Sequence, residues 1–144
     1  MSPNPVTEFA AAVLVGSCGR LLFQQRDNIP GIGYPGWISL FGGQREGSET
    51  FAQCASREVH EEIGHLVPPD GFERLGGYSG VTPDGRNVRG ELFLAFSIPV
   101  DALVVTEGTL LLVARDELPT FLPRLEPASR TAARIFLDRG FAAA

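Results

Sequence analysis

The sequence contains no lysine, so all twelve basic residues are arginines. Seventeen acidic residues outnumber them and give a net charge of −5 at pH 7. This charge argues against binding of a nucleic-acid polymer by bulk electrostatic attraction. Any cationic contact with a phosphate must come from a guanidinium, whose planar fork suits bidentate grips on oxyanions.

Cysteine is scarce and long apolar runs are absent. Cys18 and Cys54 form no metal or redox motif, so we expect two free thiols in a reducing compartment, the cytoplasm. The apolar run at Phe9–Val15 is only as long as a strand, and no basic region precedes it. We therefore expect neither a signal peptide nor a membrane span.

The remaining composition is that of one globular domain. The chain has 144 residues, of which 44% are hydrophobic and 20% are charged. These values predict a single domain over residues 1–144 with a core of its own.

Strand and helix patterns alternate along the chain. Apolar runs at Thr7–Val15 and Arg20–Gln25, joined by residues 16–19, predict a hairpin. Residues 27–36 are rich in proline and glycine and predict a loop. Further strands are expected at Trp37–Phe41, Phe72–Val81, Glu91–Ile98 and Thr109–Ala114, with a turn at Thr82–Gly85 and a helix at Pro127–Arg139. This order predicts an α/β fold with a mixed sheet between helices.

The segment from Gly43 to His65 is the most informative part of the chain. We expect a helix that is capped by Ser48, runs to about Ile63 and stops at Gly64. An apolar stripe on this helix would face the core, and it consists of Ala52, Ala55, Val59 and Ile63.

Three carboxylates share one side of the expected helix. Glu58, Glu61 and Glu62 fall within an arc of about 100°. They repel one another, and without a counter-charge at least one should keep its proton. A divalent cation removes this conflict, and all-oxygen ligation suits Mg²⁺ or Mn²⁺.

The alternative interpretation is a solvated, Glu-rich surface helix. A surface helix would explain a pair of adjacent glutamates. It would not explain why Gly43, Glu49, Arg57 and Gly64 also stand at fixed offsets from them.

With these residues the segment resembles the signature box of the Nudix hydrolases. That box reads Gly, five residues, Glu, seven residues, Arg-Glu, an aliphatic, any residue, Glu-Glu, any residue, Gly and an aliphatic. His65 replaces the last aliphatic, and Phe41 stands where a proline usually precedes two glycines. The resemblance implies a Nudix-type α/β/α sandwich.

The resemblance also implies an activity. It is the Mg²⁺-dependent hydrolysis of a phosphoanhydride bond in a nucleoside triphosphate, or in a nucleoside diphosphate linked to another moiety. A Nudix-fold sensor that binds nucleotides without turnover is the alternative, and the intact carboxylates argue against it. The substrate class is a small nucleotide-type molecule whose identity the sequence leaves open, and a homodimer is compatible with the sequence.

Matching positions to the box implies roles for its residues. Glu58, Glu61, Glu62 and the carbonyl of Gly42 are the implied metal ligands. The catalytic acids would be Glu58, Glu61 and Glu107, and which of them is the base is left open. Structural support of the site would come from Gly43, Glu49 and Arg57.

Outside the box, four residues are candidates. Arg26 ends a strand and is assigned to a phosphate, although a solvated arginine would look the same. Glu107 precedes an apolar strand and could supply a further carboxylate, with Glu91 as the second choice. Tyr34 is assigned to substrate binding, where it would stack on a base, whereas we expect its neighbour Trp37 to pin the loop to the core.

Overall fold

The computed structural model describes residues 5–32 and 34–140. In this part of the chain seven strands form one mixed sheet. The strands are β1 (Val6–Gly16), β2 (Leu21–Gln25), β3 (Ile38–Ser39), β4 (Phe41–Gln44), β5 (Glu73–Val81), β6 (Asn87–Ile98) and β7 (Thr109–Val113). The helices are α1 (Phe51–Ile63), the short α2 (Leu118–Phe121) and α3 (Pro127–Arg139).

Strand β1 lies at the centre of the sheet. It runs parallel to β6 along most of its length, and β5 follows β6 as an antiparallel neighbour. On its other side β1 pairs with two strands in succession, because β4 pairs with Phe9–Ala12 and β2 pairs with Leu14–Val15. The junction between β2 and β4 therefore lies beside the middle of β1.

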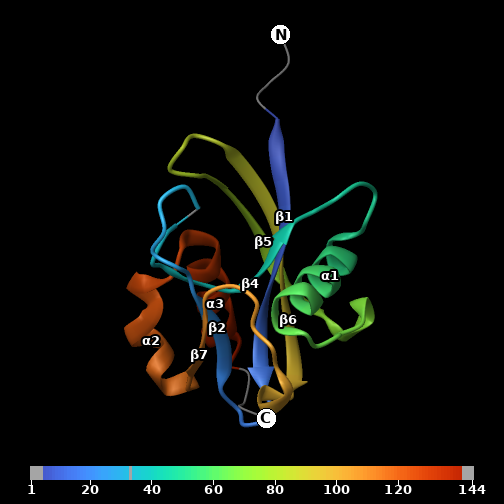
Figure 1. The fold of residues 1–144 in the computed structure, drawn as a ribbon, viewed down its shortest axis with the longest axis vertical. Coiled ribbons are helices and arrows are strands. Elements are labelled where there is room, and N and C mark those ends of the chain that lie inside the picture. The colour runs from blue at the N-terminus through green and yellow to red at the C-terminus, as the bar shows by residue number, and fades with distance from the viewer. Residues whose placement is uncertain (1–4, 33, 141–144) are drawn as a thin grey trace.

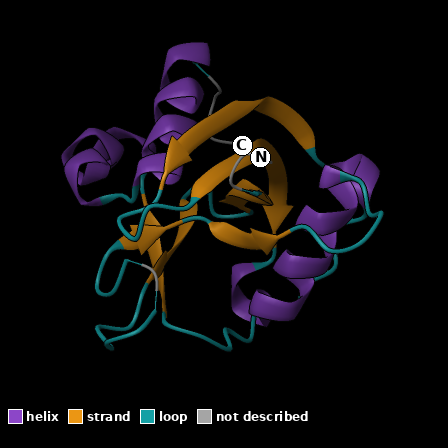
Figure 2. Cartoon of the chain, turned by 90° about the horizontal axis from the view of Figure 1, so that it is seen from above, coloured by secondary structure: helices purple, strands orange, loops and turns teal. Residues whose placement is uncertain are grey.

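The alternation of β1 side chains divides the core between two layers. Val13 and Val15 pack on one face in a cluster that includes Phe136 of α3. Ala12 and Leu14 pack on the other face in a cluster that includes Val59 of α1. Helix α1 covers one face of the sheet, and α2 and α3 lie on the opposite side (Figures 1 and 2). The predicted α/β/α sandwich with a mixed sheet is confirmed.

Helix α1 begins later than the sequence suggested. Its N-cap is Thr50, not Ser48. Thr50 Oγ1 accepts a hydrogen bond from Gln53 N (3.1 Å), and Gln53 Oε1 accepts one from Thr50 N (2.8 Å). This reciprocal capping box satisfies two backbone donors. Ser48 could not form such a box, because the residue three positions after it is Phe51, which has no acceptor side chain. The stop at Gly64 was correct, since Gly64 adopts the left-handed conformation with φ 71°.

The expected strand at Trp37–Phe41 is in fact two short strands. Ile38–Ser39 pairs with β2, and after Leu40 the chain changes partner, so that Phe41–Gln44 pairs with β1. Gly42 tolerates the close approach of β4 to β1, because it has no side chain to clash with the backbone of Ala10 and Ala11. The pairing of β6 also begins at Asn87 rather than Glu91, because β1 and β5 supply partners for its polar first residues.

The other predicted elements agree with the structure. The β1–β2 hairpin, the loop at residues 27–32 and 34–36, the turn at Thr82–Gly85 and the bounds of α3 all match, while residue 33 of the predicted loop lies outside the described residues. Both cysteines are free, Cys18 exposed and Cys54 buried. Within the described ranges, no helix is long and apolar enough to cross a membrane.

The corrected start of α1 is testable by two alanine substitutions. Thr50→Ala removes the side-chain acceptor of the capping box and should lower the free energy of unfolding by about 1 kcal/mol. Ser48→Ala, the matched control, should change it by less than about 0.5 kcal/mol. Chemical denaturation of both variants measures the difference. Equal losses would return the helix start to Ser48.

Candidate functional site

The two glycines of β4 lie unusually close to their neighbours. A Cβ on Gly42 would stand 2.6 Å from the Cα atom of Ala11 on β1. A Cβ on Gly43 would stand 2.5 Å from Oε2 of Glu58 on α1. Only glycine permits both approaches. The pairing of β4 with β1 therefore brings the carboxylate side of α1 against the sheet.

Glu62 is the carboxylate most closely joined to the sheet. Its Oε1 accepts a hydrogen bond from the Gly42 amide at 2.8 Å. The pKa of Glu62 is raised to about 8, mainly by burial, and the neighbouring charges of Glu58 and Glu107 contribute to the same shift. This agrees with the expectation that one of the clustered acids holds its proton without a counter-charge. Burial contributes more than the repulsion on which that expectation was based.

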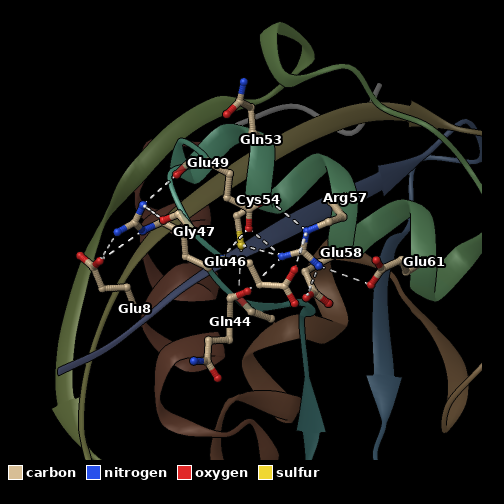
Figure 3. A network of polar contacts seen from close by, with 12 residues as sticks. Glu8, Gln44, Glu46, Gly47, Glu49, Gln53, Cys54, Arg57, Glu58 and Glu61 are labelled. Atoms are coloured by element: carbon tan, nitrogen blue, oxygen red, sulfur yellow. Dashed lines mark hydrogen bonds and ion pairs between the residues drawn. The ribbon is translucent and has the colours of Figure 1, made fainter. Parts of the chain in front are cut away.

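Glu58 and Glu61 both turn toward Arg57. Glu58 is half-buried, which raises its pKa, and its Oε1 accepts a hydrogen bond from Arg57 Nη1 at 2.8 Å. Glu61 is 58% exposed, and its Oε2 lies 3.5 Å from the same nitrogen (Figure 3). As a result, the described residues include no three His, Cys, Asp or Glu side chains already gathered as a metal site.

Arg57 joins helix α1 to the loop that precedes it. Its Nη2 lies 2.7 Å from Glu49 Oε1, and its Nε lies 3.1 Å from Glu49 Oε2. The same Nη2 donates to the carbonyl of Gln44 at 3.1 Å. Glu49 also accepts from the Glu46 amide (Figure 3). The hydrogen bonds from Arg57 are the main reason that the pKa of Glu49 falls to about 2, so the pair is fully ionised near neutral pH.

Cys54 of α1 contacts strand β4 next to this loop. Its buried thiol donates to the carbonyl of Gly43 at a distance of 3.4 Å. Burial raises the pKa of Cys54 to about 12, so the thiol keeps the proton that it donates. It packs in the core and is not an exposed nucleophile.

Glu107 lies beside the end of α1, in a loop anchored on both sides. Thr106 donates from its amide to the carbonyl of Glu62 at 3.1 Å, which satisfies an end-of-helix acceptor. The buried side chain of Gln24 on β2 donates to the carbonyl of Glu107 at 2.7 Å. The second choice, Glu91, is instead ion-paired with Arg74 of β5 at 2.5 Å.

A cavity of about 820 Å³ opens next to the two glycines. It is lined by Gly42, Gly43, Arg26 and Tyr34 among others, and the charge of Arg26 reaches Glu62 and lowers its pKa. Arg26 therefore lines the cavity and is near enough to Glu62 for its charge to act on that carboxylate.

Aromatic side chains form two edge-to-face pairs at this cavity. The ring centroids of Tyr34 and Trp37 are 5.8 Å apart, and those of Phe9 and Tyr78 are 6.2 Å apart. Trp37 is 40% exposed, so the expectation that it pins the loop to the core was wrong. It lines the cavity together with Tyr34.

Gln24 and Thr106 were not identified from the sequence, although Gln24 gave a signal. It occupies an inward position two residues after Leu22, in a strand whose first three residues are apolar, and its side chain is 4% exposed. A buried amide needs a partner, and this one is a distant loop carbonyl. Thr106 carried no comparable signal, because its role depends on the loop reaching α1.

Comparison with known proteins gives a family. The sequence model of the NUDIX domain matches residues 7–128. A MutT NUDIX hydrolase from Burkholderia pseudomallei is similar in structure, with a TM-score of 0.75, 23% identity and coverage of 91% of this chain and 98% of that one. A MutT protein from Methanosarcina mazei Go1 has a TM-score of 0.79 and 18% identity, with 98% and 100% covered.

A third solved structure is similar over one part of a longer protein. It is a bifunctional NMN adenylyltransferase/ADP ribose pyrophosphatase from Francisella tularensis, complexed with AMP and a Mn ion. The TM-score is 0.72 at 18% identity, and the match covers 96% of this chain and 43% of that one. Comparison with curated protein sequences gave no match.

The domain match spans most of the chain, so this protein belongs to the NUDIX family. It is a pyrophosphohydrolase, an enzyme that cleaves the pyrophosphate bond in derivatives of nucleoside diphosphates.

The position of Arg57 predicts a combined loss of stability and activity in Arg57→Ala. Glu49 and Glu58 would both lose their cationic partner, and the free energy of unfolding should fall by about 1–3 kcal/mol. Hydrolysis should fall as well, because the loop before α1 is released. Denaturation and steady-state kinetics measure both effects.

Arg86→Ala is a control for loss of an arginine. Arg86 pairs with Asp84 in an exposed turn, so its removal should change stability by less than about 0.5 kcal/mol. An Arg57→Ala protein as stable as Arg86→Ala would contradict the interpretation of Arg57 as a support of the site.

Proposed function

We propose that this enzyme hydrolyses a phosphoanhydride bond of a nucleoside triphosphate, or of a nucleoside diphosphate linked to another moiety, with Mg²⁺ or Mn²⁺ as cofactor. The observation that carries the proposal is the burial of Glu62 and Glu58 against Gly42 and Gly43, next to a large cavity. Buried carboxylates without a cation are costly, and a divalent ion offsets that cost.

The residues at this place fit a hard divalent cation. The donors are oxygens only, namely the carboxylates of Glu58, Glu61 and Glu62 and the backbone carbonyl of Gly42, and Mg²⁺ and Mn²⁺ prefer such donors. The missing side chain of Gly43 leaves the space that the Glu58 carboxylate occupies. Arg57 contacts one oxygen of Glu58 and one of Glu61, so each carboxylate keeps a second oxygen for an ion while Arg57 also holds Glu49.

A bound ion would neutralise charge on the anhydride oxygens and so favour attack by water. The chain supplies the other requirements. Arg26, which lines the cavity and whose charge acts on Glu62, can hold a phosphate of the substrate by its guanidinium fork. Tyr34 stands at the cavity with Trp37, where the two rings offer flat apolar surfaces to a base. Glu107, whose charge acts on Glu62, is our candidate to accept a proton from water.

The direct test is a screen for divalent-ion-dependent hydrolysis. Nucleoside triphosphates, oxidised nucleoside triphosphates, nucleotide sugars and ADP-ribose should each be tested with Mg²⁺, Mn²⁺ and chelator, with product analysis to locate the broken bond. Turnover that stops on chelation supports the proposal. A tight nucleotide complex without turnover of any of these would favour the sensor instead.

Glu62→Gln should separate ion binding from folding. Glutamine keeps an oxygen acceptor for the Gly42 amide but loses the negative charge that binds the ion. We expect kcat to fall by about 10²-fold or more. Mg²⁺ at one hundred times its dissociation constant should stabilise the wild type by about 2.7 kcal/mol, and this increment should shrink in the variant.

Two measurements test the Glu62 prediction, namely kcat at saturating Mg²⁺ and the melting temperature with and without the ion. Glu73→Gln serves as the control, because Glu73 is an exposed acid at the start of β5 that does not line the cavity. Equal kcat in Glu62→Gln and the wild type at saturating Mg²⁺ would remove Glu62 from the ligand set.

Substitution of Glu107 and of Glu91 should have different effects on kcat. If Glu107 accepts the proton, Glu107→Gln should lower kcat by about 10²-fold with little change in melting temperature, because its exposed side chain has no ion pair in the described structure. Glu91→Gln should instead affect mainly the pairing with Arg74. Steady-state kinetics and melting of both variants distinguish the two acids, and a fully active Glu107→Gln protein would shift the assignment to Glu91.

A further inference from the structure

We propose that Glu8, on β1 and outside the NUDIX box, is a positioning residue for the hydrolytic site. It acts through Arg45, which holds the loop between β4 and α1. This inference rests on the proposed function, since it concerns how the ion-binding carboxylates are kept in place.

Glu8 stands where the chain leaves the sheet. The ladder between β1 and β4 ends just beyond Phe9 and Gln44, and the amide of Arg45 makes a last backbone bond to the carbonyl of Glu8 at 2.8 Å. Across the sheet, Glu8 is the register partner of Arg89 on β6. The backbone bond between Glu8 and Arg45 is therefore the last contact between β1 and the chain before the loop begins.

The side chain of Glu8 is held between two arginines. Its Oε1 accepts from Arg45 Nη2 at 2.6 Å and from Arg45 Nε at 3.2 Å, and its Oε2 accepts from Arg89 Nη2. The side chain is 20% exposed, and these two arginines keep the pKa of Glu8 below its usual value. The carboxylate thus remains charged and oriented at neutral pH.

Arg45 carries this anchorage into the loop. Its Nη1 donates to the carbonyls of Gly47 (3.2 Å) and Glu49 (2.9 Å), while its guanidinium lies 5.4 Å from the ring centroid of Phe51, the first residue of α1. One planar group therefore contacts the sheet, the loop and the start of the helix. A lysine has no such fork and could not make these contacts together.

The loop then transmits the restraint to the site. Glu49, whose carbonyl Arg45 holds, grips Arg57 with both carboxylate oxygens, and Arg57 in turn contacts Glu58. Figure 3 shows this succession from Glu8 through the loop to Glu58 and Glu61. Arginines and glutamates alternate along it, so each charge is compensated by its neighbours.

A positioning role differs from a purely stabilising one in what it changes. Loss of a structural ion pair would lower the melting temperature and leave the ion affinity unaltered. Loss of a positioning group should weaken ion binding and turnover, and outer partners of metal ligands typically contribute about 10–100-fold. For Glu8→Gln we expect about 10-fold weaker binding of Mn²⁺ and a similarly reduced kcat, with an unchanged KM.

The experiment measures three properties of each variant. Isothermal titration gives the Mn²⁺ affinity without substrate, hydrogen exchange reports the protection of residues 44–50, and kinetics gives kcat and KM. Glu8→Gln, Arg45→Lys and the double variant should show the same loss, because they break one link. Arg89→Gln is the matched control, since Arg89 is 62% exposed, touches Glu8 and, among the described residues, forms no hydrogen bond or ion pair with the loop. It should change Mn²⁺ affinity less than about 2-fold.

The outcomes separate this inference from the proposed function. If the wild type binds no Mn²⁺, the proposed function fails, and the positioning role fails with it. If the wild type binds Mn²⁺ normally and Glu8→Gln shows unchanged affinity and loop protection, only the positioning role is overturned. Equal losses in Arg89→Gln and Glu8→Gln would also overturn it, because the effect would then not pass through Arg45.

Discussion

The hydrogen bond from the Gly42 amide to the Glu62 carboxylate joins the two halves of the molecule that form the site. One end belongs to a strand in the central sheet and the other to the helix that covers it. The bond forms because Gly42 approaches β1 more closely than any other residue could, which sets the depth of β4. Glu62 is buried at this contact, and burial raises its pKa although the hydrogen bond from Gly42 lowers it, so a cation is favourable here. The close approach of Gly42 to β1 thus determines both the packing of β4 and the position of the Glu62 carboxylate.

A second set of contacts orients what this bond brings together. Arg57 restrains Glu58 and Glu61 on one side and Glu49 on the other. On the opposite side of Glu62, the loop bearing Glu107 satisfies the last carbonyls of α1. The carboxylates therefore stand between two segments that are hydrogen-bonded to the same helix. A helix end that lacked those partners would leave buried acceptors unsatisfied.

The sequence was most informative where function requires fixed spacing. The box on α1, its stop at Gly64 and the pairing of Arg57 with Glu49 follow from offsets along one helix and the loop before it. It was less informative where geometry is decided by distant partners. The change of partner at Leu40 depends on the space beside β1, and no local pattern encodes it. The same holds for Arg45 and Glu8, which are 37 residues apart.

The walls of the cavity come from elements other than helix α1. They are formed by β1, the loop at residues 27–36, the turn between β5 and β6 and the start of α3, whereas the carboxylates belong to α1. Surface loops accept insertions and substitutions at low energetic cost. Evolution can therefore alter which part of a substrate these walls recognise while leaving helix α1 unchanged. In this architecture a new substrate preference requires only new loops, and the reaction itself is inherited.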